Sequence, residues 1–358
     1  DILLKANMTK FKANTRRDLP RIAEKLRFNR DQLTDMQAVS AVLPFRVNDY
    51  VIEHLIDPED VPNDPIFQLT FPQRGMLEEE DFRRMRDLVA KGATETEIKL
   101  AADEIRGRLN PHPAGQMQLN VPLLDGEVVG GMQHKYQETV LFFPSQGQTC
   151  HAYCSYCFRW AQFVGDADLK FASREANQLV NYVRENPQVS SVLITGGDPM
   201  VMKTPVLRRY IEPLLRANLP NLHSIRIGTK ALAYWPYRFT EGADADDFLR
   251  LIGEVKEAGK HFALMAHSSH SRELEPPVAR RAVERVLNAG AVIRCQAPLI
   301  RKVNDKTGRK LTLRRLATAC KEAAAKLRTK KSDSKAYKAH VAKLKKDKWS
   351  YQTLWRHM

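Results

Sequence analysis

The sequence has no uninterrupted apolar run that approaches the roughly 18 residues of a membrane-spanning helix. Its amino-terminal stretch also lacks the apolar segment of an export signal. These two absences argue against a membrane protein and against a secreted one, so we expect a cytoplasmic protein without membrane contact. The chain begins at Asp1 rather than at Met, which leads us to expect a processed or partial protein.

Cysteine is scarce, with five residues among 358. Three of them form a CxxxCxxC box of Cys150, Cys154 and Cys157, directly after the apolar run at 140–143. Three thiolates in one loop can hold a metal ion or an iron-sulfur cluster, because thiolate is the soft ligand that both prefer. A disulfide framework does not fit, since three closely spaced cysteines leave one unpaired.

A structural zinc site is closed by four protein ligands, and no second CxxC or HxxxH pair follows the box. The remaining cysteines, Cys295 and Cys320, are isolated, and His151 would crowd the two cysteines that flank it. Zinc is therefore disfavoured. We expect a [4Fe-4S] cluster with three irons on cysteine and the fourth open to a small molecule.

From residue 132 onward the sequence alternates short apolar runs with amphipathic helical stretches. The expected strands cover residues 140–144, 189–194, 223–227, 261–265 and 291–295, and the expected helices include 175–184 and 246–258. This alternation predicts an α/β fold with a parallel sheet, in which ligands bind at the carboxyl ends of the strands. Candidate binding residues follow the strands at that edge: Gly196, Gly197, Asp198, Thr229, His267 and Gln296.

The box after a first strand, with Tyr156 just before its last cysteine, resembles the radical S-adenosylmethionine (radical SAM) superfamily. Phe158 and Arg159, the LITGGDP run at 193–199 and the IRIGT run at 225–229 resemble the lysine 2,3-aminomutase branch, over a match from about residue 55 to about residue 305. The resemblance implies a partial (β/α) TIM-like barrel, a [4Fe-4S] cluster, and SAM bound at the open iron.

The resemblance also assigns roles around SAM. It places Gly196, Gly197 and Asp198 near the methionyl end of SAM, and Thr229, His267 and Gln296 around the cofactor pocket. Each position has a plainer alternative. Two glycines often serve only as a tight turn, and His267, like His270, can equally be a structural histidine. Cys295 fits a small buried hydrophobe better than a ligand.

Arg159 matches the position at which the family clamps the substrate carboxylate, a task that suits a planar guanidinium. The alternative interpretation is that Arg159 is an ordinary surface arginine. Lys135 is the charged residue that stands where relatives have two arginines near the phosphate of pyridoxal phosphate (PLP). PLP is thus implied by the resemblance, while the lysine that would form its Schiff base is not identified in this chain.

We expect four parts. Residues 1–130 read as mainly helical, with helix returning at 78–109, and residues 131–300 as the radical SAM core. Residues 301–348 read as a basic helical insertion or tail, and 349–358 as a core helix resuming in a chain truncated before the sixth strand. Residues 301–348 hold 18 Lys and Arg against 4 Asp and Glu, or +14 of the total charge of +15. Such a block suits a solvated helical pair, or a surface for nucleic acid or another polyanion.

The function implied by the resemblance is a radical SAM aminomutase. It would generate a 5′-deoxyadenosyl radical for 1,2-amino migration on an amino acid, assisted by PLP and supplied with electrons by a reductant such as flavodoxin or ferredoxin. A homo-oligomer is left open, and the amino acid is not indicated. One alternative is a PLP-independent radical SAM enzyme acting on another substrate, such as RNA. The other is a nucleic-acid-binding protein that keeps the barrel as a scaffold, which the intact cysteine box argues against.

Overall fold

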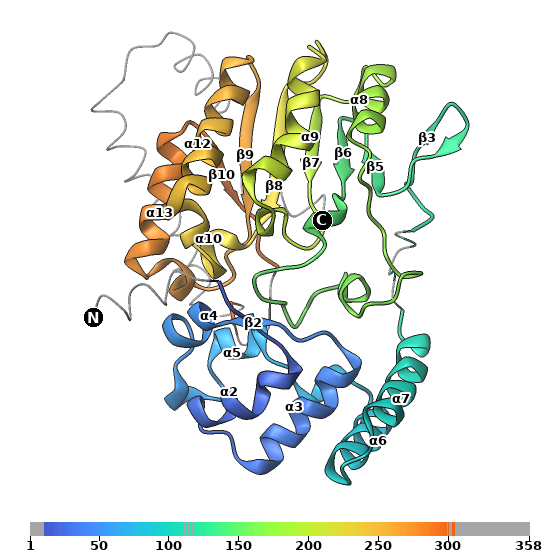
Figure 1. Cartoon of the computed structure of the whole chain (residues 1–358), viewed down its shortest axis with the longest axis vertical. Coiled ribbons are helices and arrows are strands. Elements are labelled where there is room, and N and C mark those ends of the chain that lie inside the picture. The colour runs from blue at the N-terminus through green and yellow to red at the C-terminus, as the bar shows by residue number, and fades with distance from the viewer. Residues whose placement is uncertain are drawn as a thin grey trace. The chain divides into compact units, whose positions relative to one another are not determined.

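The computed structural model describes residues 11–110, 112, 115, 117–298, 300, 303 and 304. These residues form a mixed α/β structure with a mostly parallel six-stranded sheet and a helical amino-terminal region, both within one compact unit (Figure 1). Within the described ranges, no helix has both the length and the apolar composition that crossing a bilayer requires. The block at 301–348 lies outside the described residues except for Val303 and Asn304, and 349–358 and Cys320 lie outside them entirely.

The sheet has the strand order β10-β9-β8-β7-β6-β5. Pairing is parallel from β6 to β10, while β5 adds an antiparallel edge strand. The five expected strands are found close to their predicted positions, and β5 is a sixth that the sequence analysis missed. The bounds are β5 (Met132–Tyr136), β6 (Thr139–Phe142), β7 (Ser191–Ile194), β8 (Ser224–Thr229), β9 (His261–Ala266) and β10 (Val292–Cys295).

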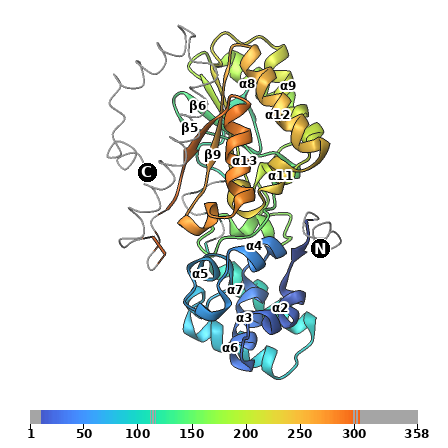
Figure 2. The same ribbon diagram turned by 90° about the vertical axis from the view of Figure 1, so that its left-hand side faces the viewer.

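Helices between the parallel strands cover one face of the sheet (Figures 1 and 2). On β8, Ile225 and Ile227 point into this layer and are fully buried, while Arg226 between them is only half-buried on the other face. The apolar sides of the helices complete the core cluster. The helices that follow β6 are α8 (Ala176–Glu185), α9 (Thr204–Arg216), α10 (Ala231–Tyr234), α11 (Tyr237–Thr240), α12 (Gly242–Glu257) and α13 (Pro277–Asn288).

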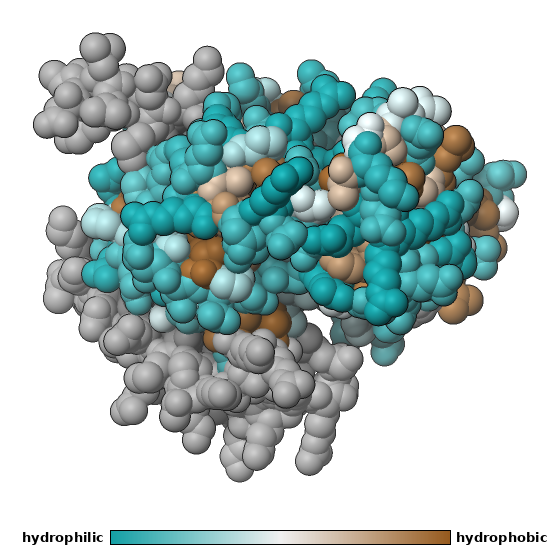
Figure 3. Space-filling model, turned by 90° about the horizontal axis from the view of Figure 1, so that it is seen from below, coloured by the Kyte–Doolittle hydropathy of each residue, from teal (hydrophilic) through white to brown (hydrophobic). Residues whose placement is uncertain are grey.

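The amino-terminal region is mainly helical, as expected. Its helices are α2 (Leu19–Lys25), α3 (Arg30–Val42), α4 (Asp49–His54), α5 (Pro65–Thr70), α6 (Glu79–Ala90) and α7 (Glu95–Arg108). The helix expected at 78–109 is two helices, because Gly92 adopts a positive φ of 69° and Thr94 then caps α7 in a capping box with Glu97. The side of this region seen in Figure 3 is mostly hydrophilic.

Two short antiparallel pairs lie outside the main sheet: β1 (Ala13–Asn14) with β2 (Val47–Asn48), and β3 (Leu123–Leu124) with β4 (Glu127–Val128). The first pair lies where the helical region meets the carboxyl edge of the sheet. There the buried Asn48 amide donates to the carbonyl of His151 at 3.1 Å and to that of Tyr234 at 2.9 Å. One apolar cluster spans this junction, joining residues of α2 to α5 with Ala152 and Trp235.

Candidate functional site

The cysteine box lies on the segment that links β6 to α8; residues 148–159 are called the cysteine loop here. Main-chain hydrogen bonds from the helical region hold it in place. The Tyr153 N–H donates to the Arg46 carbonyl at 2.8 Å, and the Ser155 N–H donates to the Leu69 carbonyl at 2.8 Å. The helical region thus fixes the loop at the carboxyl edge of the sheet. The two are far apart in the sequence: Asn48 precedes its partner His151 by 103 residues.

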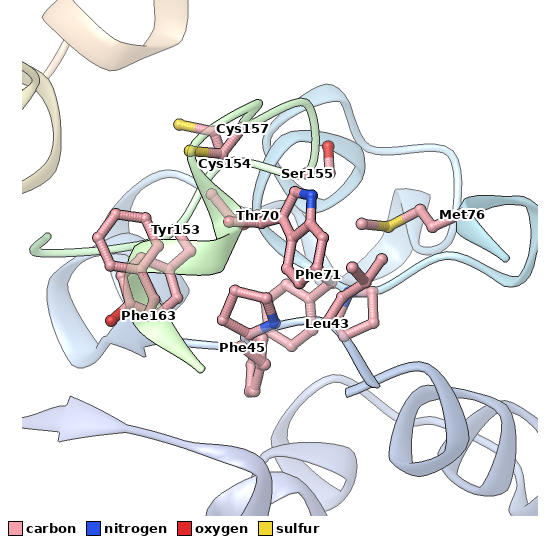
Figure 4. A pocket seen from close by; sticks show the side chains of 13 residues that line it. Leu43, Phe45, Thr70, Phe71, Met76, Tyr153, Cys154, Ser155, Cys157 and Phe163 are labelled. Atoms are coloured by element: carbon pink, nitrogen blue, oxygen red, sulfur yellow. The ribbon is translucent and has the colours of Figure 1, made fainter. Parts of the chain in front are cut away.

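The three thiols of Cys150, Cys154 and Cys157 are close enough to affect one another's ionisation. Burial, followed by the charge of Cys154, raises the pKa of Cys157 to about 12. Burial also raises the pKa of Cys150, with Asp198 and the other two thiols acting in the same direction. Figure 4 shows the sulfur atoms of Cys154 and Cys157 on the same side of the loop.

The thiols are neighbours without forming a ready-made ion site. In the described part of the chain, no group of three or more His, Cys, Asp or Glu side chains is arranged to hold a metal ion. Three thiolates repel one another until a cationic centre offsets their charge, and metal binding releases their protons. The donor set, three soft ligands on one fixed loop, therefore fits an iron-sulfur cluster better than a preformed four-ligand zinc site.

Asp198 joins the ends of β7 and β8 to the cysteine loop. It is 3% exposed, and its carboxylate accepts from the Thr229 hydroxyl at 2.7 Å, from the Lys230 N–H at 2.9 Å and from the Met200 N–H at 2.9 Å. Burial opposes ionisation, but the His151 ring and these hydrogen bonds prevail and lower the pKa of Asp198. The side chains of Asp198 and Thr229, both predicted SAM contacts, thus make buried hydrogen bonds within the protein.

The two glycines before Asp198 are required by close packing. A Cβ on Gly197 would lie 2.4 Å from the carbonyl oxygen of Thr149, and one on Gly196 would lie 2.2 Å from the Gln148 side chain. Gly196 also has a φ of +144°, which side-chain-bearing residues rarely adopt. The start of the cysteine loop therefore accounts for both glycines, and their contact with SAM stays a prediction.

His267 and Gln296 follow β9 and β10 at the same edge as the cysteine loop. Burial, and secondarily the charge of Lys230, lowers the pKa of His267 to about 4, so its imidazole is neutral at pH 7. The backbone N–H of His267 donates to Thr229 at 2.9 Å, and that of Gln296 donates to Ala266 at 2.7 Å. The structure thus brings these residues to the edge at which the sequence predicted them.

Lys135 does not join this group. It lies on β5, whose antiparallel pairing sets Tyr136 beside Thr139, the first residue of β6. Lys135 is therefore near the amino end of β6, whereas the cysteine loop follows its carboxyl end. The side chain is exposed, and its ammonium lies 5.9 Å from the centre of the Tyr136 ring. The antiparallel edge strand, which the sequence analysis missed, accounts for this position.

Arg159 is a buried cation without a hydrogen-bonded partner for two of its nitrogens. The residue is 8% exposed, and neither Nε nor Nη2 has a hydrogen-bond partner among the described residues. The guanidinium carbon stacks 4.1 Å from the centre of the Phe143 ring, and burial lowers the pKa of Arg159 to about 10. The contact with an anionic substrate that the sequence predicts for Arg159 stays a prediction.

A small cavity lies on the helical-region side of the cysteine loop (Figure 4). Its volume is about 70 Å³, and apolar side chains such as Phe45, Phe71 and Trp160 line it. A space of this size holds a few water molecules at most. Cys154 and Cys157 of the box also line it.

A buried ion pair that was not expected from the sequence lies at the same edge. The Lys230 ammonium lies 2.9 Å from a carboxylate oxygen of Glu273, and their side chains are 10% and 0% exposed. Lys230 could have been noticed as a lysine directly after a strand. Glu273 carried no such signal, because 43 residues separate it from its partner.

Comparison with known proteins shows what the chain is similar to. No protein-family model matches it. A candidate L-lysine 2,3-aminomutase of Aquifex aeolicus is 29% identical over 275 residues, which are 77% of this chain and 61% of the relative. The L-lysine 2,3-aminomutase of Bacillus subtilis is 26% identical, over 69% of this chain and 54% of the relative. The glutamate 2,3-aminomutase of Clostridioides difficile is 26% identical, over 70% of this chain and 48% of the relative. The chain thus spans between 48% and 61% of the length of these relatives.

Proposed function

From its lysine 2,3-aminomutase-like homology, which places this chain in the radical SAM aminomutase family, we propose that it is an enzyme that moves an amino group between neighbouring carbons of an amino acid. On this proposal, the parallel sheet and its helices are part of a (β/α) barrel of the radical SAM type. The substrate is proposed only as an amino acid, because the names of the relatives include both lysine and glutamate.

The observation that carries the proposal is the position of Arg159. This buried guanidinium, two of whose nitrogens have no hydrogen-bond partner among the described residues, comes two residues after Cys157, on the same loop as the three thiols. A buried cation without a partner is unfavourable by itself, so a site that retains one is suited to an anionic ligand. The carboxylate of an amino acid would supply that charge beside the cluster.

Cys150, Cys154 and Cys157 would hold the [4Fe-4S] cluster. Bound together, the cluster and SAM supply the one-electron chemistry that removes a hydrogen atom from an unactivated carbon. The chain's own residues would do the positioning. Arg159, supported by the Phe143 ring, would orient the substrate carboxylate, while Asp198 would hold the ends of β7 and β8 against the cysteine loop.

PLP is not supported by the described residues. Lys135 lies at the opposite edge of the sheet, and Lys230 is engaged with Glu273. A second candidate is a radical SAM enzyme that acts without PLP on another substrate. The flavodoxin or ferredoxin reductant, the polyanion surface and the homo-oligomer remain further proposals.

Anaerobic reconstitution of the full chain with iron and sulfide tests the proposal. We expect cluster absorbance, and release of methionine from SAM after reduction. Replacing Cys150, Cys154 or Cys157 with Ala should abolish both signals. The matched control is Cys295→Ala, since Cys295 lies at the same edge but outside the box. A cysteine-box variant with full cluster content would overturn the assignment.

The same preparation separates the two candidate functions. Added PLP should produce a new absorbance band if the chain itself binds it, and amino migration should then depend on PLP. Without such a band, but with cluster formation and SAM cleavage, the PLP-independent enzyme becomes the better interpretation.

A further inference from the structure

The face of the sheet away from the helices carries a row of polar side chains at the amino ends of its strands. Figure 2 shows the helices between the strands on the opposite face. Backbone pairing sets four polar residues side by side on successive strands: Thr139 on β6, Ser191 on β7, Ser224 on β8 and His261 on β9. The cysteine loop lies at the carboxyl edge, so this row belongs to a different part of the sheet.

The Arg226 side chain extends over this row. Arg226 lies two residues beyond Ser224 on β8, so its side chain leaves the sheet on the same face. Its Nη2 donates to the Thr139 hydroxyl at 2.8 Å. Because β7 lies between β8 and β6, the side chain must cross β7 to make this bond. Ser191 is the residue of β7 that pairs with Thr139, so the guanidinium comes to lie beside Ser191.

Two buried donors at this place have no hydrogen-bond partner among the described residues: Nε of Arg226 and the hydroxyl of Ser191, a residue that is 8% exposed. Their neighbours in the row are engaged. Thr139 accepts from Arg226, and the Ser224 hydroxyl lies 3.3 Å from Nδ1 of His261. A structural link between β8 and β6 needs only Nη2 of Arg226. It leaves the other two donors unexplained, and a buried donor without an acceptor is unfavourable.

The positive charge of Arg226 is not compensated by the described residues either. Burial, followed by the like charge of Arg294, lowers the pKa of Arg226, and no carboxylate among the described residues acts in the opposite direction. Arg294 is exposed on β10 and lies on the same face. It pairs with Met265, which pairs with Gly228, two residues beyond Arg226. Two cations on one face, beside two donors that have no described acceptor, suit a ligand with negative charge.

We propose that Arg226 and Ser191 bind an oxyanion group of a small ligand, a phosphate or a carboxylate, and that Arg294 adds positive charge to this site. The guanidinium supplies a charge-assisted hydrogen bond and the hydroxyl a neutral one, and both are directed at oxygen acceptors. The site uses no residue of the cysteine loop. It therefore goes beyond the proposed function and does not depend on it.

The test is urea unfolding of the full chain at pH 7 with increasing inorganic phosphate or acetate, at an ionic strength held constant with sodium chloride. An anion that binds the folded chain stabilises it, and the dependence on anion concentration gives the affinity. Arg226→Met should weaken the affinity about tenfold or more, and Ser191→Ala about threefold. The matched control is Arg184→Met, on the exposed side of α8, which should leave the affinity unchanged. A general salt effect of phosphate acts equally on all variants, so the differences between them report the site.

If Arg226→Met does not fold, Ser191→Ala provides the measurement, because it removes a hydroxyl that has no partner among the described residues. Equal affinities of the unaltered chain and the folded variants for both anions overturn the inference, and so does an equal loss in Arg184→Met. Tighter binding of phosphate than of acetate identifies a phosphate-bearing ligand, and the reverse order identifies a carboxylate. Chain prepared without iron should give the same affinities, so this result and that of the cluster experiment are independent.

Discussion

The Nδ1 atom of His151 lies 3.7 Å from a carboxylate oxygen of Asp198, and both side chains are buried. One residue belongs to the cysteine loop and the other follows β7, so their contact joins the loop to the sheet. The Asp198 carboxylate also accepts hydrogen bonds at the ends of β7 and β8. We therefore expect its loss to disturb the site.

Asp198→Asn should lower the free energy of unfolding by about 2 to 3 kcal/mol at pH 7, because a buried charged acceptor of several hydrogen bonds is lost. The pKa of Asp198 is lowered in the folded protein, so its contribution is present above the ordinary carboxyl pKa of about 4. It disappears as the pH falls through the lower, folded pKa. Urea unfolding from pH 7 down to pH 3 measures the free energy of unfolding of Asp198→Asn and of the unaltered protein. The difference between these two free energies should narrow below about pH 4.

The control for this measurement is Asp87→Asn, on the exposed face of α6, which should change stability by no more than about 0.5 kcal/mol. A constant difference between Asp198→Asn and the unaltered protein over the whole pH range would contradict the role given to the carboxylate.

Gly197→Ala should destabilise the protein by about 2 kcal/mol or more, because the new Cβ would meet the Thr149 carbonyl at 2.4 Å. Gly253→Ala is the matched control. Gly253 lies within α12 and a Cβ there meets nothing within 4 Å, so this change should stabilise by about 0.5 to 1 kcal/mol. Midpoints of urea unfolding measure both. Equal effects of the two substitutions would refute the close approach of the cysteine loop.

Arg159→Met should keep or raise the free energy of unfolding, by about 1 kcal/mol. It removes a buried cation that has two unpaired nitrogens within the described structure, and it retains contact with Phe143. The same change should raise the KM for the amino acid substrate by about tenfold or more, through loss of charge-assisted hydrogen bonds. Arg184→Met, on the exposed side of α8, is the control for both measurements. A large loss of stability without a change in KM would make Arg159 a structural residue.

The basic block at 301–348 gives a prediction about nucleic acid. If it binds a polyanion, the logarithm of affinity should fall against that of salt concentration with a slope of about −0.9 per phosphate on duplex DNA and about −0.7 on single strands. Deletion of the block should remove this binding and spare the cluster spectrum. The deletion must begin after Asn304, because Val303 is in the core and Asn304 donates to Ser269. Absence of binding at low salt would leave the solvated-helix interpretation.

The sequence predicted the repeating part of the fold because apolar runs and amphipathic stretches alternate there over long distances. The strands at 223–227 and 261–265 correspond to β8 and β9, each within a residue or two of its observed bounds. The strand β5 was missed because its outer half is exposed and polar, so no apolar run marks it. The β3–β4 hairpin has only two residues on each strand, too few for a pattern to form.

The sequence could predict the site residues that directly follow strands. It could not predict those whose position depends on contacts between residues far apart in the sequence. Asp198, Thr229, His267 and Gln296 reach one edge because parallel strands end together. Lys135 lies away from this edge because β5 runs antiparallel to β6, and its contact with PLP stays a prediction. Glu273 and its partner Lys230 are 43 residues apart, a separation that leaves no local periodicity to detect.

The backbone bonds from Arg46 and Leu69 to the cysteine loop also limit how this protein can be divided. A cut near residue 110 looks natural in the sequence, since a proline-rich stretch follows α7 there. The carboxyl-terminal fragment from such a cut would keep all three box cysteines and lose the carbonyls that shape their loop. We therefore expect that the two fragments, expressed separately, yield a cluster only when they are mixed.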